Sequence, residues 1–193
     1  PQKVAMAREK EIKELENRVY EIVNIEEAWE KTGKEPIPVR WVDVRKKDGR
    51  YRSRLVAKDY KRKGEGTAAE LFASMPPLEL VKLLLARAVA VREKTMVIDI
   101  KKAYLHAPVK GDVYVDLPPE RYSPGKCARL LFTLYGMRPA ARNWEDEYGG
   151  TLAENDFQVG KANGSTFFHK ERGVRVVVHG DDFASTGAIE DLE

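Results

Sequence analysis

Two adjacent carboxylates, Asp181 and Asp182, limit the possible structures of this chain more than any other feature. They lie between two runs rich in apolar and β-branched residues, 174–179 and the run that begins at Phe183. Gly180 precedes the pair, so the segment predicts two strands joined by a tight turn that carries both carboxylates. Side-by-side carboxylates repel each other unless a positive charge lies beside them, which favours a divalent cation such as Mg²⁺. An Asp-Asp pair alone is a weak signal, because most such pairs are exposed turns.

A third carboxylate, Asp99, ends the short apolar run 95–99, which predicts a buried strand. If this strand neighbours the predicted hairpin, three Asp side chains meet at adjacent strand ends. Such a set can hold two metal ions, one to activate an attacking 3′-oxygen and one to stabilise a leaving pyrophosphate. The sequence therefore makes Asp99, Asp181 and Asp182 the candidate metal ligands.

The rest of the chain alternates irregularly between helical and strand patterns. Helices are predicted over 3–22, 25–31, 78–92 and 139–155, with a helical turn at 102–107. Further strands are predicted over 39–44, 51–57, 113–117, 129–135 and 166–170. The apolar stripe of the helix 78–92 consists of Leu80, Leu83, Leu84, Ala88 and Val91. Hairpins combined with irregular alternation favour an α+β fold over a parallel α/β fold.

The runs 39–44 and 51–57 predict a hairpin, because Asp48-Gly49 between them is a strong tight-turn signal. The stretch from Arg40 to Lys63 holds eleven Lys or Arg and three Asp. Since the net charge of the whole chain is only +3, the remainder is net acidic. A compact basic patch on a near-neutral protein is typical of a polyanion partner, and a solvated basic loop explains the charge equally well.

Composition is that of a globular protein with a core, since 42% of the 193 residues are hydrophobic. The apolar runs are too short to span a membrane, and no secretory signal is visible. Cys127 is the only cysteine, which excludes an internal disulfide and favours an intracellular, reducing compartment. The chain begins with Pro1 rather than Met, as a piece of a longer protein would.

Short motifs follow one another along the chain: Arg40-Trp-Val, Tyr51-Arg-Ser-Arg-Leu-Val-Ala-Lys58, Ile98-Asp-Ile-Lys-Lys-Ala-Tyr-Leu-His-Ala107, Val113-Tyr-Val-Asp-Leu-Pro118, Leu134-Tyr-Gly-Met-Arg-Pro-Ala-Ala-Arg-Asn-Trp144 and Val177-Val-His-Gly-Asp-Asp-Phe183. In this order they resemble the motifs of the reverse transcriptase of Copia-type (Pseudoviridae) LTR retrotransposons. The family has, for example, Asp-Val-Lys-Thr-Ala-Phe-Leu-Asn-Gly, Leu-Tyr-Gly-Leu-Lys-Gln-Ala-Pro-Arg-x-Trp and Tyr-Val-Asp-Asp. The resemblance spans about Ala5 to Gly187, nearly the whole chain.

This resemblance implies an RNA-directed DNA polymerase with a right-hand fold, in which an antiparallel, RRM-like palm sheet is backed by helices. It implies an N-terminal helical segment over 1–38, fingers with the basic hairpin over 39–92, and a palm over 93–193 that stops before the thumb. The implied substrates are dNTPs and an RNA or DNA template-primer, with two Mg²⁺ or Mn²⁺ ions as cofactors and no membrane. A thumb, an RNase H domain and an integrase are expected in a parent Pol polyprotein, in a cytoplasmic virus-like particle.

Site residues follow from the same motifs. Asp99, Asp181 and Asp182 are the implied catalytic metal ligands, with the carbonyl of Ile100 as an additional ligand. Tyr104 is implied as the steric gate that excludes a 2′-hydroxyl, and a core aromatic is the alternative for this residue.

Further residues are expected to contact the nucleotide or the nucleic acid. The implied nucleotide-binding residues are Lys46, Arg52, Arg54, Tyr135 and Gly136. Because side chains alternate along a strand, only one face of the hairpin can point inward. Arg138 and Arg142 are candidates for template contact, and surface salt bridges explain them equally well.

The chain also departs from the family pattern. His179-Gly180 replaces an aromatic and an apolar residue before the Asp pair, so Gly180 presents no side chain to the primer end. Asp59 replaces a usual glycine. Three other functions remain open: a repurposed, non-catalytic nucleic-acid-binding module, another two-metal enzyme such as a nuclease or a nucleotidyl cyclase, and a basic RNA-binding domain. Retention of all three Asp argues against the first, and Tyr135-Gly136 with the basic hairpin argues against the second.

Overall fold

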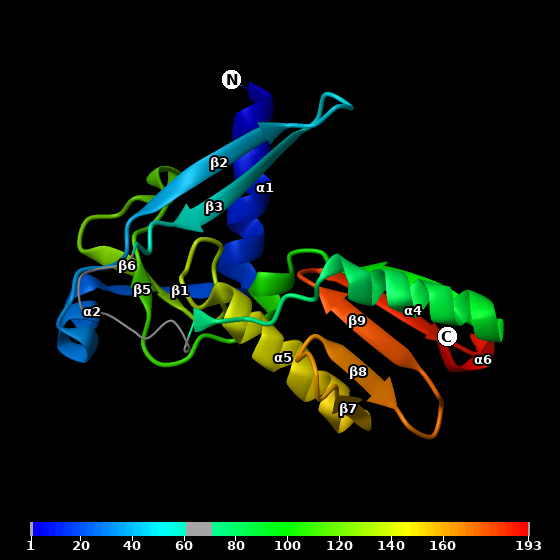
Figure 1. Cartoon of the computed structure of the whole chain (residues 1–193). Coiled ribbons are helices and arrows are strands. Elements are labelled where there is room, and N and C mark those ends of the chain that lie inside the picture. The colour runs from blue at the N-terminus through cyan, green and yellow to red at the C-terminus, as the bar shows by residue number, and fades with distance from the viewer. Residues whose placement is uncertain (1, 61–70, 193) are drawn as a thin grey trace. The chain divides into compact units, whose positions relative to one another are not determined.

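The computed structural model describes residues 2–60 and 71–192 (Figure 1). The basic residues 61–63 of the stretch above lie outside these described residues. The chain divides into two compact units. Unit 1 comprises Pro1–Leu71 and Tyr104–Asn143, and unit 2 comprises Phe72–Ala103 and Trp144–Glu193. Each unit therefore combines two separate stretches of sequence, and the functional segments 1–38, 39–92 and 93–193 stay a prediction.

Unit 1 is built from helices and short strands around a main apolar core, with a smaller cluster of Ala28, Tyr114 and Cys127 beside α2. Its elements are α1 (Gln2–Arg18), β1 (Tyr20–Asn24), α2 (Ile25–Thr32), β2 (Val39–Arg45), β3 (Tyr51–Ala57), most of η1 (Ala103–His106), β5 (Tyr114–Val115), η2 (Pro119–Arg121) and β6 (Lys126–Leu130). Strands β1, β6 and β5 form an antiparallel sheet, and β2 pairs with β3 in a hairpin. The core includes Leu15, Leu55, Leu105 and Leu134, so that α1, β3, η1 and the loop after β6 share one apolar centre.

Unit 2 is an antiparallel sheet with helices packed against it. Its elements are α4 (Leu78–Val91), β4 (Lys94–Asp99), most of α5 (Ala140–Glu154), β7 (Phe157–Val159), β8 (Thr166–His169), β9 (Arg175–His179), β10 (Asp182–Gly187) and α6 (Ile189–Leu192). The strand order is β4-β10-β9-β8-β7, and every neighbouring pair is antiparallel.

Helix α5 packs on the sheet of unit 2 through aromatic rings. Tyr148 on the helix makes edge-to-face contacts with Phe167 of β8 and Phe183 of β10, with ring centroids 5.9 and 5.6 Å apart. Side chains alternate between the two faces of a strand, so Asp182, next to Phe183, points to the other face. The aromatic cluster thus supports the sheet from the face opposite to Asp182.

The predicted α+β fold is confirmed, and several helices and both principal hairpins occur where the sequence indicated. The helix predicted over 3–22 is wrong beyond Arg18, because Tyr20–Asn24 instead forms β1 and pairs with β6. The strand predicted over 129–135 is β6, which lies earlier, at Lys126–Leu130. Among the helices of residues 2–60 and 71–192, none combines the length and the apolar composition that a membrane span requires.

Two burial predictions are also wrong. Strand β4 is at the edge of its sheet, so Val97 is 69% exposed rather than buried. In α4 the buried residues are Leu84 and Ala88, whereas Leu83 and Val91 of the predicted stripe are exposed. Helix α4 is covered on one side only, so only a narrow part of its apolar stripe is buried and the remainder faces solvent.

Candidate active site

The register of β4 against β10 brings two of the predicted metal ligands together in unit 2. Asp99 on β4 is the direct partner of Asp182 on β10, and Asp182 also pairs with His179 across the β9–β10 hairpin. Directly opposed residues of antiparallel strands have Cβ atoms roughly 5 Å apart and point to the same face. The prediction that Asp99 lies on a strand beside the Asp pair is thereby confirmed.

Asp181 occupies the turn between β9 and β10. Gly180 and Asp181 are its two central residues, and Gly180 has a φ of 65°. Asp181 has no such left-handed backbone, so the turn has the pattern of type II′, which favours glycine at its first central position. The Asp181 carbonyl accepts a hydrogen bond of 2.8 Å from the Ile100 amide, which ties the turn to the end of β4.

The carboxylates of Asp99, Asp181 and Asp182 are exposed and do not converge on a preformed ion site. Within residues 2–60 and 71–192, no three His, Cys, Asp or Glu side chains lie close enough together to hold a metal ion. The opposed pair of Asp99 and Asp182 nevertheless offers hard oxygen donors from two strands. Mg²⁺ is commonly bound by one or two carboxylates, with water and substrate phosphates completing its shell, so the donor chemistry fits this ion.

Trp144 is a residue near the acidic turn to which the sequence assigned no role. Its indole Nε1 donates a 2.8 Å hydrogen bond to the carbonyl of Gly180. The ring also makes an edge-to-face contact with Phe183, whose centroid lies 6.3 Å away. Trp144 lies in the predicted motif 134–144, but only the folded chain brings it to the turn.

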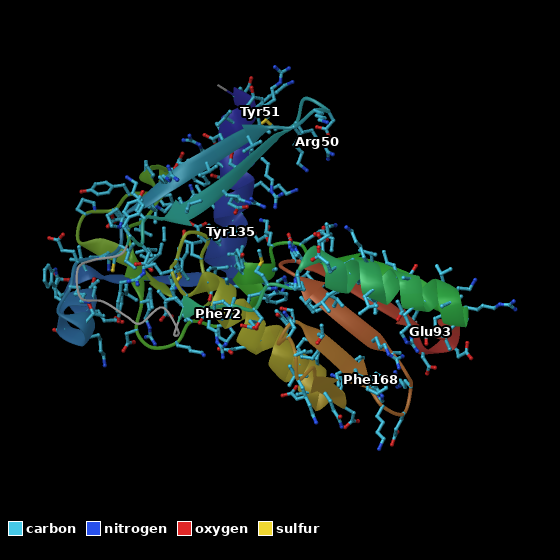
Figure 2. All side chains as sticks on the ribbon, viewed as in Figure 1. Arg50, Tyr51, Phe72, Glu93, Tyr135 and Phe168 are labelled. Carbon is cyan, nitrogen blue, oxygen red and sulfur yellow. The ribbon has the colours of Figure 1, made fainter. Side chains whose placement is uncertain are left out.

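In unit 1, two of the predicted cations share one face of the β2–β3 hairpin. Ser53, Leu55 and Ala57 of β3 are buried, so Arg52 and Arg54 share the opposite face. Figure 2 shows Arg50 and Tyr51 near the hairpin tip, where the Lys46 amide bonds to the carbonyl of Arg50 at 2.8 Å. Lys46 therefore lies at the turn, and the two arginines lie along the strand.

Arg54, Tyr135 and Tyr104 form a stack in unit 1. The Arg54 guanidinium carbon lies 4.8 Å from the centre of the Tyr135 ring, and Tyr135 meets Tyr104 edge to face at 5.7 Å. Both tyrosines are half-buried against the core, so Tyr104 is not a fully enclosed core residue. Arg54 Nε is buried and has no hydrogen-bond partner among the described residues. A buried donor without an acceptor is costly, which makes this position suitable for an anion.

The loop that carries Tyr135 and Gly136 is fastened to the end of β3. The Ala57 amide donates to the Tyr135 carbonyl at 2.7 Å, and the Arg138 amide donates to Asp59 Oδ2 at 2.9 Å. Gly136 has a φ of 81°, and a Cβ there would overlap the carbonyl oxygen of Ala57. The glycine is thus explained by its close approach to β3. Arg138, just before α5, and Arg142, in its first turn, are both half-buried.

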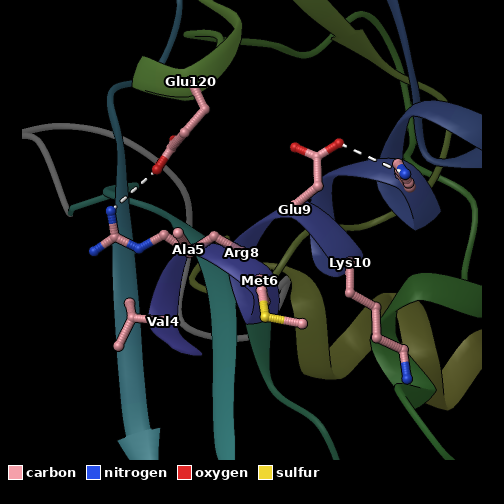
Figure 3. A pocket seen from close by; sticks show the side chains of 8 residues that line it. Val4, Ala5, Met6, Arg8, Glu9, Lys10 and Glu120 are labelled. Carbon is pink, nitrogen blue, oxygen red and sulfur yellow. Dashed lines mark hydrogen bonds and ion pairs between the residues drawn. The ribbon is translucent and has the colours of Figure 1, made fainter. Parts of the chain in front are cut away.

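A separate cavity of about 900 Å³ lies along α1 in unit 1 (Figure 3). Two ion pairs lie among its residues: Arg8 binds Glu120 at 3.1 Å, and Glu9 binds Lys13 at 3.9 Å. None of the predicted site residues lines this cavity.

Comparison with protein families gives one match that covers most of the chain. The model of the family described as "Reverse transcriptase (RNA-dependent DNA polymerase)" matches residues 17–191. The matched range includes β4, the acidic turn and the β2–β3 hairpin.

Several retrotransposon proteins are similar to this chain. The Retrovirus-related Pol polyprotein from transposon RE1 of Arabidopsis thaliana is 30% identical over 77% of this chain, and that from transposon TNT 1-94 of Nicotiana tabacum is 29% identical over 72%. The Transposon Ty1-NL2 Gag-Pol polyprotein of Saccharomyces cerevisiae is 28% identical over 57%. The matched part spans only 11% of each plant protein and 6% of the yeast protein.

Proposed function

This chain belongs to the reverse transcriptase family of Copia-type retrotransposons, and on this basis we propose that it is an RNA-directed DNA polymerase. The reaction is transfer of a nucleotide from a dNTP to a primer 3′-hydroxyl, with release of pyrophosphate. The observation that carries the proposal is the register of β4 and β10, which sets Asp99 opposite Asp182 beside the turn of Asp181. Like charges directly opposite one another are unfavourable unless a cation binds between them.

In this proposal Asp99, Asp181 and Asp182, together with the carbonyl of Ile100, bind two Mg²⁺ or Mn²⁺ ions. When bound, such ions activate the primer 3′-oxygen and neutralise charge on the leaving pyrophosphate. The exposed position of the three carboxylates suits this role, because phosphate oxygens of the substrate supply further ligands.

The cations and tyrosines of unit 1 are proposed to bind the incoming nucleotide. Arg52 and Arg54 share one face of the hairpin, and the unpartnered Arg54 Nε is a ready donor for a phosphate oxygen. Lys46 at the turn adds a mobile positive charge. The Tyr135 ring offers a stacking surface, and Tyr104, which packs against it, would exclude a 2′-hydroxyl.

We assign the β2–β3 hairpin to the fingers and the five-stranded sheet of unit 2 to the palm of a right-hand polymerase, with α5 backing an RRM-like sheet. Gly180 then lies near the primer end, and Arg138 and Arg142 are proposed template contacts. Because the relatives are Pol and Gag-Pol polyproteins, we further propose that a thumb, an RNase H domain and an integrase belong to the parent protein. A cytoplasmic particle is the proposed location.

Primer extension on an RNA template with dNTPs and Mg²⁺ or Mn²⁺ tests this function. The wild type is compared with Asp182→Asn, which removes one ligand charge, and with Asp112→Asn, an exposed Asp in unit 1. We expect extension by the wild type and Asp112→Asn and none by Asp182→Asn. Equal extension by all three contradicts the proposal. RNA binding that needs no metal, without extension even after the downstream thumb is restored, would favour a non-catalytic binding module.

A further inference from the structure

The acidic turn of unit 2 is held from behind by a tryptophan of α5. We propose that Trp144 is a positioning residue, whose indole N–H holds the Gly180 carbonyl and thereby fixes the direction of the Asp181 and Asp182 carboxylates. The hydrogen bond is 2.8 Å long and joins residues 36 positions apart in sequence. The bond itself is independent of the proposed polymerase function, and its consequence for metal binding rests on that function.

Trp144 is well placed to act as a rigid anchor. Its side chain is in the core, with 7% of the residue exposed. The ring packs edge to face against Tyr148 at 5.5 Å and against Phe183 at 6.3 Å, and Phe183 directly follows Asp182. Rotation of the indole would break these contacts, so the direction of its N–H group is fixed by the packing.

The turn itself needs such an anchor. Glycine has the greatest backbone freedom of all residue types. Gly180 also contributes no side chain that could pack against a neighbour. Its carbonyl belongs to the peptide plane that continues into Asp181, so tilting this plane redirects the following carboxylates. The next carbonyl, that of Asp181, is held by the Ile100 amide at 2.8 Å. Trp144 and Ile100 therefore fasten two successive peptide groups, one from the helix and one from the residue that follows β4.

The donor, rather than the size of the ring, is the feature that matters in this arrangement. A phenylalanine at position 144 could still pack against Tyr148 and Phe183, but it could not donate to Gly180. A purely structural tryptophan would stabilise the fold without influencing the turn. The two roles differ in what happens to the backbone at residues 180–182 and to metal affinity when the donor is removed.

The test compares Trp144→Phe with Trp41→Phe in the full chain. Trp41 is a matched control, because its indole donates a 2.9 Å hydrogen bond to Glu120 in unit 1. The first measurement is ¹⁵N relaxation of the amides of Asp181 and Asp182 without metal. We expect nanosecond motion to increase at these amides in Trp144→Phe and to stay at the wild-type level in Trp41→Phe. Unchanged relaxation in a folded Trp144→Phe protein overturns the proposal.

The second measurement is the affinity for Mn²⁺, followed by paramagnetic broadening of the amide signals near the acidic turn. We expect Trp144→Phe to weaken Mn²⁺ binding about tenfold, as loss of a group that orients metal ligands does, and Trp41→Phe to bind like the wild type. Equal affinity of Trp144→Phe and the wild type contradicts the positioning role. Absence of Mn²⁺ binding in the wild type contradicts the proposed function instead, and the relaxation data still decide the role of Trp144.

If Trp144→Phe does not fold, the first two measurements cannot be made on it. A third measurement then tests the proposal on the wild type alone. The indole N–H of Trp144 should exchange with solvent far more slowly than that of Trp29, which lies on the surface-exposed side of α2 with 48% of the residue exposed. Exchange of both indoles at the same rate would show that the Gly180 hydrogen bond does not persist in solution, and the proposal would be withdrawn.

Discussion

Gly136 and Gly180 both have a left-handed backbone, but their surroundings differ. At Gly136 a Cβ would overlap backbone and side-chain atoms of β3, whereas at Gly180 no atom lies within 4 Å of that position. A left-handed conformation costs an L-residue about 1–2 kcal/mol, and overlap with a fixed backbone adds to this. The two glycines are therefore required for different reasons.

We predict that Gly180→Ala lowers the free energy of unfolding by about 1 kcal/mol, and that Gly136→Ala lowers it by roughly 3 kcal/mol, since β3 must also move. Urea unfolding of the two variants measures both values. Gly49→Ala is the control, because Gly49 also has a positive φ and open space around it. Gly136→Ala behaving like Gly49→Ala would show that the contact with β3 is not tight.

At this scale the sequence proposes residues for the site but gives no indication of the contacts that fix them. The order of the motifs predicts Asp99, Asp181 and Asp182 as site residues, and the structure shows that Asp99 and Asp182 are strand partners. The bonds of Trp144 to Gly180 and of Arg138 to Asp59 join residues 36 and 79 positions apart. Such bonds depend on how whole elements pack, and neither residue pair has a local pattern that predicts them.

At the scale of elements, the β2–β3 hairpin is attached to α1 by a charged cluster. Arg8 of α1 binds both oxygens of Asp43, at 2.7 and 3.3 Å, and Ser53 donates to Asp43 at 2.7 Å. The Arg8 guanidinium also lies 5.2 Å from the centre of the Trp41 ring. The cluster holds the strand that carries Arg52 and Arg54, so it fixes the direction in which the hairpin projects from unit 1.

This cluster makes the stability of unit 1 depend on pH. The hydrogen bond from Arg8 lowers the pKa of Asp43 below its ordinary value, while partial burial opposes the shift. The pKa of Asp43 is lower in the folded than in the unfolded state, where it is about 3.9. The stabilisation of the fold by the Arg8–Asp43 interaction is therefore complete above the unfolded-state pKa, and it is lost as pH falls through the folded-state pKa. We predict that Asp43→Asn removes about 1 kcal/mol of stability at pH 7 and less at pH 3.

Urea unfolding of the wild type and Asp43→Asn between pH 7 and pH 3 measures this dependence. The matched control is Asp48→Asn, since Asp48 pairs with Arg50 at 2.6 Å within an exposed turn. Solvent screens such a pair, so this variant should change the pH profile less. A larger effect at Asp48 than at Asp43 would mean that the contact of α1 with the hairpin contributes little.

Elements with strong local signals were predicted, and elements defined by their partners were not. The hairpin with Asp48-Gly49 and the helix α4 occur where the sequence places them. Strand β1 was missed because its apolar residues continue the helical spacing of α1, and only pairing with β6 makes it a strand. The exposure of β4 also escaped prediction, because edge and central strands have similar sequences when they are short.

For the whole molecule, the important fact is that each unit draws strands from both halves of the chain. Strand β1 pairs with β6 in unit 1, and β4 pairs with β10 in unit 2. A break between residues 103 and 104 therefore separates partners in both sheets. We predict that the isolated pieces 1–103 and 104–193 do not fold into structures with a cooperative unfolding transition. When the two pieces are mixed, we expect them to regain the native structure.

Far-UV circular dichroism with thermal melting, followed by ¹H–¹⁵N spectra of each piece and of the mixture, tests this prediction. The intact chain provides the reference spectrum. A well-dispersed spectrum and a cooperative melt of the isolated piece 104–193 would show that β8, β9 and β10 do not need β4. In that case the edge strand would be an accessory to the sheet rather than part of its folding unit.

Because paired strands lie far apart in the sequence, they emerge from the ribosome at different times during translation. The only partner of β4 among the described strands, β10, leaves the ribosome about 80 residues after it, which at 5–20 residues per second is roughly 4–16 s. During this interval the backbone groups of β4 that later pair with β10 have no strand partner. Translation speed and the supply of chaperones should therefore influence the yield of this protein.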